Sequence, residues 1–419
     1  MENLTDVRVI KIYRIIEDYL NCLNSIQETF ANNYKILKES EKNAKQSFKN
    51  FITQNKEPDF NSLTPFQIKE LKSIIKKVGR TEQAVIIFPQ SMLVSIVSQY
   101  DYLVGQLIQF IYEVNPKLLQ ESNSQISYKD LFTYNDIGAI RDKIIQDKVE
   151  TILRKSHDEQ IDDLQKISGV KNLKGVRFWK EFVEITQRRN LFVHCKGCVS
   201  EQYIKECQNV GLVKLPSKGE NLNVDEGYFL RAYFVFYMMG ALLTQVIIRQ
   251  LLSKENLLGE IDTILTNIIY ETLEEEKYDL TIELSEFAMA GSTKHACRLD
   301  EVYFVLNHAQ AHKWKGNQEE CNKILTQFDF SAMTSDILVA KFALEDNIEQ
   351  VVEHMYKVGN TSNIMRKDSY ASWVIFKEMR KKVEFKNAYK NIFGEDLILE
   401  SLTPEENKVV KDLESNLQN

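Results

Sequence analysis

The sequence predicts an all-α protein made of long helices joined by short loops. Glycine (15) and proline (6) together make up about 5% of the 419 residues, whereas their average usage is roughly 12%. Apolar residues recur at spacings of three and four along much of the chain, which is the period of one helix face. So few turn-forming residues do not suit the many tight turns of a β-sandwich or barrel.

We expect residues 1–84 to form an N-terminal helical arm, as one long helix or a helical hairpin. Apolar side chains follow the helical period from residue 9 to 23, at Val9, Ile12, Ile16, Leu20 and Leu23. The pattern stops between residues 55 and 65, and the segment 65–79 is expected to be a short helix with Pro65 near its start. The arm's simplest role is packing or dimerisation.

Residues 85–254 carry the most apolar helices and are expected to form a helical bundle. We predict helices over 90–114, a pair over 135–166, one over 172–196 that stops at Gly197, and a short one from about Ser200. Asp225 is the expected N-cap of a last helix that ends near Leu252. Its segment 232–248 is almost wholly apolar, but it is shorter than the roughly 20 residues of a membrane span. We therefore expect a buried core helix and no membrane association.

Residues 255–419 are expected to form a third, helical region. It opens with a strongly acidic stretch, since residues 255–290 hold ten acidic residues and one basic residue. Asn317 and Asn347 then occupy similar places in two segments thirty residues apart, and residues 382–393 look like a looser third copy. This pattern resembles tetratricopeptide-type repeats, with a plain helical domain as the alternative.

Charge and cysteine content limit the functional class. The net charge is −7, so any nucleic-acid site must be a local positive patch and not a global field. The first twenty residues contain acids where a secretory signal peptide has a basic head. Six scattered cysteines do not suggest a disulfide framework. We expect a reducing, cytoplasmic compartment.

The helix over 176–197 interrupts its own apolar pattern. Two adjacent stripes run along it, one from Phe178 through position 192 and one from Trp179 through position 193, and together they form a wide face for a bundle core. At one level both stripes are broken, by Arg189 and Asn190. An arginine aimed inward stays charged and is costly to bury unless it is paired. A functional site would explain its presence.

The local charge agrees with this interpretation. Residues 171–196 contain seven basic and two acidic residues, and such a cationic island is typical of a phosphate-binding site. The alternative is a helix whose charges are paired within the bundle. His194 follows Asn190 by one turn, but it lies about 140° around the helix from Arg189. Two copies of this helix related by a two-fold axis would bring the two side chains together.

These residues resemble a known family. The segment Arg189-Asn190-Leu191-Phe192-Val193-His194 resembles the R-x4–6-H signature of HEPN (higher eukaryotes and prokaryotes nucleotide-binding) domains. The continuation RRNLFVHCKGCVSEQYI, the segment RKSHDEQ at 154–160 and the helix around Tyr100-Asp101 look like a bacterial subgroup of that family. The resemblance covers roughly residues 85–254.

The resemblance implies a helical bundle that pairs with a second copy and acts as a metal-independent endoribonuclease without a cofactor. Arg189 would bind the scissile phosphate, Asn190 would orient the phosphate or the histidine, and His194 would be the general acid or base. Many relatives are toxins or anti-phage effectors, and here the C-terminal region would sense a trigger or protein partner. Some HEPN domains instead bind nucleotide, RNA or a protein without catalysis, which is the alternative function.

Four further residues are weaker candidates for the same site. Arg188 and Lys196 are basic neighbours expected to contact RNA. By default His157 is expected on the surface of an amphipathic helix. The family resemblance makes it a candidate for substrate contact. Asp101 lies beside the apolar stripe of the helix over 90–114, one turn before Gly105. Its carboxylate either pairs with Arg189 or Arg188 or reaches solvent.

Two other patterns could bind metal, although we predict none. Cys195 and Cys198, near His194 and Cys207, have the C-x2-C spacing of a zinc or redox motif, but a structural zinc site needs four ligands and a second pair is missing. Zinc bound to His194 would also remove its acid–base role. His308 and His312 have i, i+4 ligand spacing without the adjacent acid of H-E-x-x-H. We expect packing or surface roles for both groups.

Overall fold

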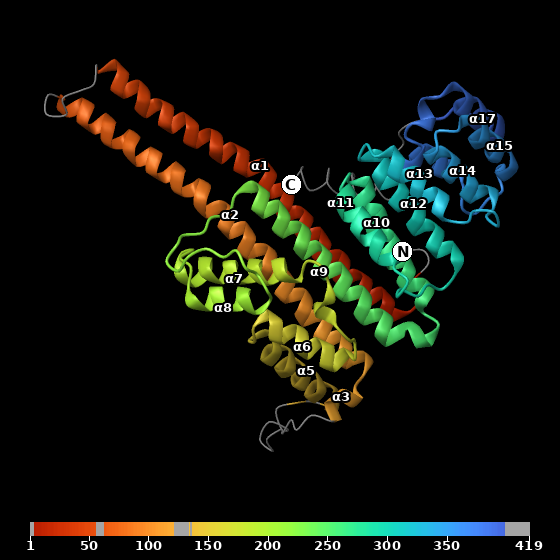
Figure 1. Ribbon diagram of the computed structural model, residues 1–419, viewed down its shortest axis with the longest axis horizontal. Coiled ribbons are helices and arrows are strands. Elements are labelled where there is room, and N and C mark those ends of the chain that lie inside the picture. The colour runs from red at the N-terminus through yellow and green to blue at the C-terminus, as the bar shows by residue number, and fades with distance from the viewer. Residues whose placement is uncertain (1–3, 56–62, 121–133, 135, 399–419) are drawn as a thin grey trace. The chain divides into compact units, whose positions relative to one another are not determined.

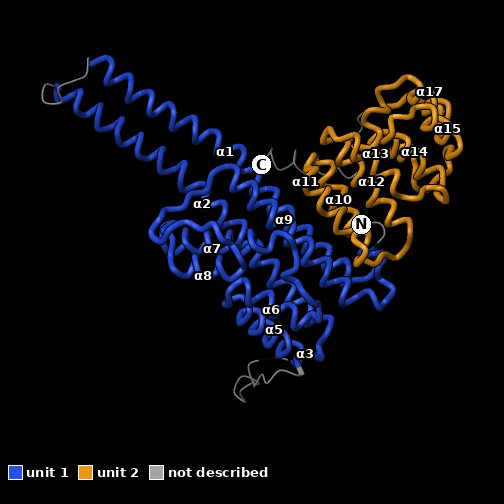
Figure 2. Tube along the Cα trace, viewed as in Figure 1, with its two compact units in different colours: residues 1–261 blue, residues 262–419 orange. Residues whose placement is uncertain are grey.

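The computed structural model describes residues 4–55, 63–120, 134 and 136–398, and these residues confirm the all-α prediction. The described part contains a single isolated β-bridge, between Cys198 and Asn221. The chain forms two compact units, residues 1–261 and 262–419 (Figure 2). The predicted interruption at 55–65 falls largely outside the described residues, and residues 121–133, 135 and 399–419 lie outside them as well.

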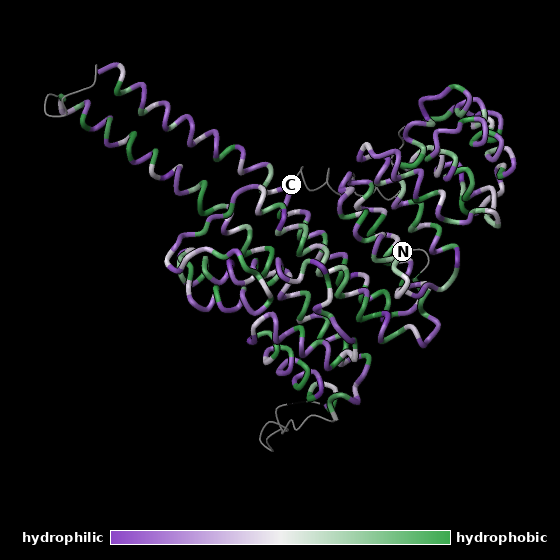
Figure 3. Tube along the Cα trace, viewed as in Figure 1, coloured by the Kyte–Doolittle hydropathy of each residue, from purple (hydrophilic) through white to green (hydrophobic). Residues whose placement is uncertain are grey.

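An antiparallel hairpin of two long helices, α1 (Val7–Gln54) and α2 (Pro65–Val114), forms the frame of unit 1 (Figure 1). Asp6 caps α1 by accepting hydrogen bonds from the backbone N–H groups of Arg8 and Val9. The predicted apolar stripe of α1 is buried, and hydrophobic and hydrophilic residues alternate along both helices (Figure 3). The stripe therefore packs the base of the arm into the unit.

Helix α2 differs from the prediction of two separate helices. A capping box between Thr64 and Gln67 starts it, Pro65 occupies its first turn as expected, and the helix then continues for 50 residues through Pro89. Proline removes one backbone hydrogen bond, but Pro89 is buried and its neighbour Phe88 stacks 6.0 Å from Phe30 of α1. The predicted domain boundary at 84/85 lies inside this helix, so the arm and the bundle form one unit.

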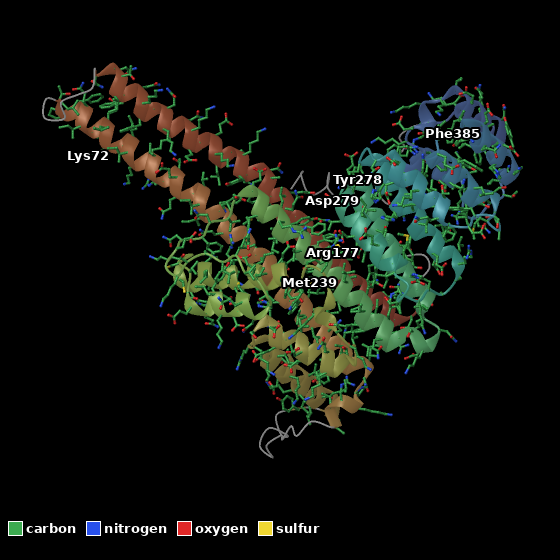
Figure 4. All side chains as sticks on the ribbon, in the orientation of Figure 1. Lys72, Arg177, Met239, Tyr278, Asp279 and Phe385 are labelled. Atoms are coloured by element: carbon green, nitrogen blue, oxygen red, sulfur yellow. The ribbon has the colours of Figure 1, made fainter. Side chains whose placement is uncertain are left out.

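Helix α9 (Glu226–Leu252) is the most completely buried element of unit 1. Asp225 caps it as predicted, with its carboxylate accepting from the backbone N–H of Tyr228 at 2.7 Å. By length and composition alone α9 could cross a membrane, but 78% of its most apolar window is buried inside the protein. Met239, labelled in Figure 4, lies within this buried stretch. The segment behaves as the central helix of a bundle, packed against α1, α2, α6 and α7.

Within the described residues, five shorter α-helices complete unit 1 around α2 and α9. They are α3 (Lys117–Gln120), α5 (Ile137–Leu153), α6 (His157–Ser168), α7 (Trp179–Cys195) and α8 (Glu201–Asn209). Helix α7 begins seven residues later than predicted, because Asn172 adopts a left-handed conformation (φ 61°) and a 3-10 turn over Leu173–Gly175 follows. At Gly105 a Cβ atom would lie 3.3 Å from Leu153 Cδ1, so glycine permits the close approach of α5.

Unit 2, whose boundary lies within the first turn of α10, consists mainly of successive helix pairs. These are α10 (Leu258–Glu274) with α11 (Tyr278–Met289), α12 (Arg298–Trp314) with α13 (Gln318–Gln327), and α14 (Ser335–Leu344) with α15 (Ile348–Val358). Two shorter helices follow, α16 (Lys367–Ser372) and α17 (Val383–Phe393). Buried apolar side chains of α12 to α17 form one core.

The same turn joins the two helices of each pair. The backbone N–H groups of residues 277, 317 and 347 each donate to the carbonyl five residues earlier, and the preceding residues Glu276, Gly316 and Asp346 all have positive φ. Asn317 and Asn347 cap α13 and α15, as their spacing suggested. The third copy lies upstream at residue 277, forty residues before Asn317, and α17 does not follow such a turn. The three turns are therefore unequally spaced, at intervals of forty and thirty residues.

The packing of α1 on α9 predicts how a substitution at Gly240 changes the free energy of unfolding. Tyr19 of α1 donates a hydrogen bond to the carbonyl of Phe236 at 2.7 Å, and a Cβ atom at Gly240 would lie 2.1 Å from Tyr19 Cε1. Gly240→Ala should therefore lower the free energy of unfolding by about 1–3 kcal/mol, the usual cost of overpacking. Urea denaturation followed by circular dichroism measures this change.

Gly79→Ala is the matched control for this substitution, because it also lies inside a helix but has no atom within 4 Å of its Cβ position. Alanine there should raise the unfolding free energy by about 0.5–1 kcal/mol through helix propensity. Equal effects at the two glycines would show that Tyr19 does not restrict residue 240.

Candidate functional site

Helix α7 presents its predicted apolar face to the bundle. The two polar residues that interrupt this face, Arg189 and Asn190, lie at the rim of the bundle core. Phe182 and Ile185 are buried, as are Val183 and Thr186 on the adjacent stripe, whereas Arg189 and Asn190 are half-buried. The expectation for position 193 is wrong, since the Val193 side chain is exposed. The last turn of α7 packs instead through Leu191, which joins Tyr203 and Cys207 of α8 in a small cluster.

A carboxylate from α2 holds the Arg189 guanidinium. Asp101 Oδ2 accepts from Arg189 Nη2 at 2.9 Å, so the predicted pairing is present and Asp101 is not a purely solvent-facing residue. The side chains of Arg189 and Asp101 are 18% and 34% exposed. A charge this close to a bundle core needs an opposite charge, and Asp101 supplies it.

His157 binds the other oxygen of the same carboxylate. Its Nε2 lies 2.9 Å from Asp101 Oδ1 and 3.5 Å from Arg189 Nη2. Since Nε2 must carry the proton that Asp101 accepts, its approach to Arg189 is a contact between two donors and not a hydrogen bond. The Asp101 carboxylate thus joins α2, α6 and α7 at one point.

The default expectation that His157 lies on the surface is wrong. Ser156 and Glu159 form a capping box that fixes the start of α6 at His157, and its ring is buried edge-on against Phe182 at a centroid distance of 6.0 Å. Tyr100 packs 6.4 Å away on another side. With its ring enclosed and its Nε2 occupied, His157 positions Asp101 and is poorly placed to contact a substrate.

The rest of the Arg189 guanidinium has no hydrogen-bond partner within the described residues. Its buried Nε has no hydrogen-bond partner, and within the described residues Nη1 has none either. A buried N–H group without a partner is unfavourable unless a ligand or water satisfies it. The guanidinium is therefore oriented through Nη2, and Nη1 keeps its N–H donors for an anion, because the fork geometry of arginine matches phosphate oxygens.

Arg188 is tied into the protein, so it is poorly placed for the predicted contact with RNA. Its Nε donates to Glu184 at 2.8 Å and its Nη1 donates to the carbonyl of Asn223 at 3.1 Å. The guanidinium also lies 4.0 Å from the centre of the Tyr228 ring. Sequence reasoning missed Glu184, which accepts hydrogen bonds from the hydroxyls of Tyr203 and Tyr228 as well. Only the i, i+4 spacing of Glu184 and Arg188 could have indicated this network.

Part of the cationic island is neutralised by other elements. Lys174 forms ion pairs with Asp158 and Asp162 of α6, and Arg189 pairs with Asp101. Lys196 is exposed at the end of α7. The local excess of positive charge along the sequence is thus smaller in three dimensions, and the alternative of a helix paired within the bundle describes part of it.

His194 and Asn190 do not join the paired cluster by any hydrogen bond within the described residues. His194 lies in the last turn of α7 and is exposed, and within the described residues neither side chain has a hydrogen-bond partner. No hydrogen bond in the described part of the chain joins Arg189 to His194. One helix therefore carries an inward arginine and an outward histidine, as the 140° separation indicated.

The possible metal ligands come together at most in pairs within the described residues. Cys195 is exposed, whereas Cys207 is buried and burial raises the pKa of its thiol to about 12. His308 and His312 face one another with their Nε2 atoms 3.2 Å apart, and burial lowers the pKa of His308 to about 4. Among the residues that the structure describes, no group of three or more histidine, cysteine, aspartate or glutamate side chains is arranged to hold a metal ion.

Comparisons with known proteins do not assign this chain to a family. No protein-family model, no curated protein and no solved structure matches it. The interpretation of the site therefore depends on its geometry and on the resemblance of its motif.

The ion pair generates a thermodynamic prediction. In a double-mutant cycle, Asp101→Ala and Arg189→Ala should show a coupling energy of about 1–2 kcal/mol, because the pair is partly shielded from water and each substitution leaves charge without its partner. Glu181 and Arg231 form the matched control, with side chains 43% and 47% exposed. Their coupling should stay below about 1 kcal/mol. Equal coupling in the two cycles would contradict a special role for Asp101.

Proposed function

We propose that unit 1 is a HEPN-type endoribonuclease that cleaves RNA without a metal cofactor. The proposal depends on the state of Arg189, which Asp101 orients through Nη2, while Nη1 and the buried Nε have no hydrogen-bond partner within the described residues. Asn190 and His194, on the same helix end, add a polar and a titratable side chain at the surface. The motif's resemblance to the HEPN signature supports the same function.

The proposed roles follow from the chemistry of RNA. The 2′-oxygen attacks the neighbouring phosphorus, the bond to the 5′-oxygen breaks, and a 2′,3′-cyclic phosphate and a 5′-hydroxyl remain. Arg189 neutralises the phosphate as charge develops on it, and Asn190 orients the phosphate or the imidazole. His194 removes or supplies a proton, because histidine titrates near neutral pH. Asp101 and His157 are positioning residues that act through Arg189.

A second copy of the chain is part of the proposal. Arg189 is directed inward to Asp101, and His194 is exposed beyond it on the same helix. A two-fold pairing of α7 helices puts Arg189 of one copy near His194 of the other. Lys196, exposed beside this end, adds positive charge for the RNA backbone. We infer a cytoplasmic toxin or anti-phage effector in which unit 2 receives a trigger or protein partner.

A non-catalytic scaffold that binds nucleotide or RNA is the second candidate. It is favoured by the neutralisation of Arg189 by Asp101 and by the pairing of Lys174 with two aspartates. A protein of this kind binds RNA and does not change it. Cleavage in the presence of EDTA separates the two functions.

The purified chain should cleave RNA in EDTA and leave 2′,3′-cyclic phosphate ends, and His194→Ala should lower the rate by at least about a hundredfold through loss of acid–base catalysis. His312→Ala is the matched control, because it removes a partly exposed histidine of unit 2 and should leave the rate unchanged. End mapping of a defined RNA measures both variants. RNA binding without cleavage by the wild-type chain would favour the scaffold, and equal rates for wild type and His194→Ala would remove His194 from the mechanism.

A further inference from the structure

A tight turn with a cysteine at each end closes the C-terminal end of α7. The Cys198 N–H donates to the carbonyl of Cys195 at 3.0 Å, and both residues between them have positive φ, 50° for Lys196 and 83° for Gly197. These values are those of a type I′ turn, which brings its first and fourth Cα atoms within about 7 Å. Disulfides form at Cα separations of about 4.4–6.8 Å.

We propose that Cys195 and Cys198 form a reversible redox-active dithiol that closes to an intrachain disulfide when the protein meets a peroxide. The site differs from the zinc interpretation of the same motif, since it needs two thiols and no further ligand. It is also independent of the proposed RNA cleavage, because its test measures the chemical state of the two sulfur atoms.

Both ends of the turn are already fixed by the fold. On the helix side, the Gly197 N–H donates to the carbonyl of Leu191 at 3.0 Å. On the other side, Cys198 forms a β-bridge with Asn221, and the Leu222 N–H donates to the Gly197 carbonyl at 2.9 Å. Closing a ring between groups that are already held close together costs little conformational entropy. This favours the disulfide over reaction with a second molecule.

The other cysteines do not share these features. Cys195 is exposed and Cys198 half-buried. Cys207 and Cys321 are buried, and burial raises the pKa of their thiols to about 12 and about 11, which suppresses the reactive thiolate. Two more, at positions 22 and 297, are exposed, but neither has another cysteine within three residues in the sequence. They serve as internal references for simple thiol oxidation.

The reaction balances with hydrogen peroxide as the oxidant. The more exposed Cys195 thiolate attacks one peroxide oxygen, the O–O bond breaks, and a sulfenic acid and hydroxide form. The Cys198 thiolate then attacks the Cys195 sulfur, the S–S bond forms and the S–O bond breaks. The released hydroxides take up the two thiol protons as water, and two electrons pass from the two thiols to the peroxide. Two molecules of glutathione return these electrons and restore both thiols.

Peptide mass spectrometry of the full-length protein tests the proposal. After limited peroxide treatment, alkylation and digestion without reductant, the peptides containing Cys195 and Cys198 should be joined or cyclised, with a mass lower by two hydrogen atoms, and glutathione should reverse this change. Cys22 and Cys297 should remain largely alkylated. Cys195 that ends as a sulfinic acid or a glutathione adduct beside a free Cys198 thiol, or equal oxidation of all four exposed or half-buried thiols, would overturn the proposal.

Two turn variants keep both thiols and test the geometry. Gly197→Val introduces a side chain at φ 83°, with a Cβ position 3.0 Å from the Leu222 carbonyl oxygen, and should lower the equilibrium yield of disulfide roughly tenfold. Lys196→Gly keeps the turn accessible and should preserve the yield. Circular dichroism checks that Gly197→Val folds. If it does not fold, Cys198→Ser decides the question, because Cys195 must then stop at sulfenic acid or a glutathione adduct.

Discussion

The ion pair between Asp101 and Arg189 is the interaction on which the centre of unit 1 depends. It places a guanidinium and a carboxylate at the rim of an aromatic core that contains Tyr100 and Phe182. Neither charge is favourable there alone, so each requires the other. His157 adds a third group on the second carboxylate oxygen. Helices α2, α6 and α7 are thereby held in one register, and the same contact sets the direction of the Arg189 side chain.

The sequence predicted one part of this centre, the inward-facing arginine, because that part depends on local periodicity. The break in the stripes of α7 identified Arg189, whereas the position of Asp101 beside the stripe of α2 left Arg189, Arg188 and solvent open as its surroundings. The buried helix α9 and its cap at Asp225 followed from composition and capping chemistry. Such features are visible in one sequence because each depends on residues within one or two helical turns.

The parts that sequence reasoning missed depend on contacts between distant segments. Pro89 alone suggests a helix start, and only the packing of Phe88 on Phe30 shows why α2 continues through it. In the sequence Arg188 resembles an RNA contact. In the structure its guanidinium binds the loop carbonyl of Asn223 and lies over the Tyr228 ring. The positive excess along α7 likewise disappears in part when acids of α6 face Lys174. The proposed site therefore contains fewer residues than the sequence suggested, with Arg189, Asn190 and His194 at its centre.

That proposal requires two copies of α7, since Arg189 faces Asp101 and His194 faces outward. Mixing the variants Arg189→Ala and His194→Ala tests it most directly, because each heterodimer regains one intact Arg189–His194 pair. We expect the mixture to recover RNA cleavage to about a quarter of the wild-type level, the share of intact pairs after random exchange, while each variant alone is inactive. No recovery despite verified subunit exchange, or an active species that sediments as a monomer, would contradict a site shared between two chains.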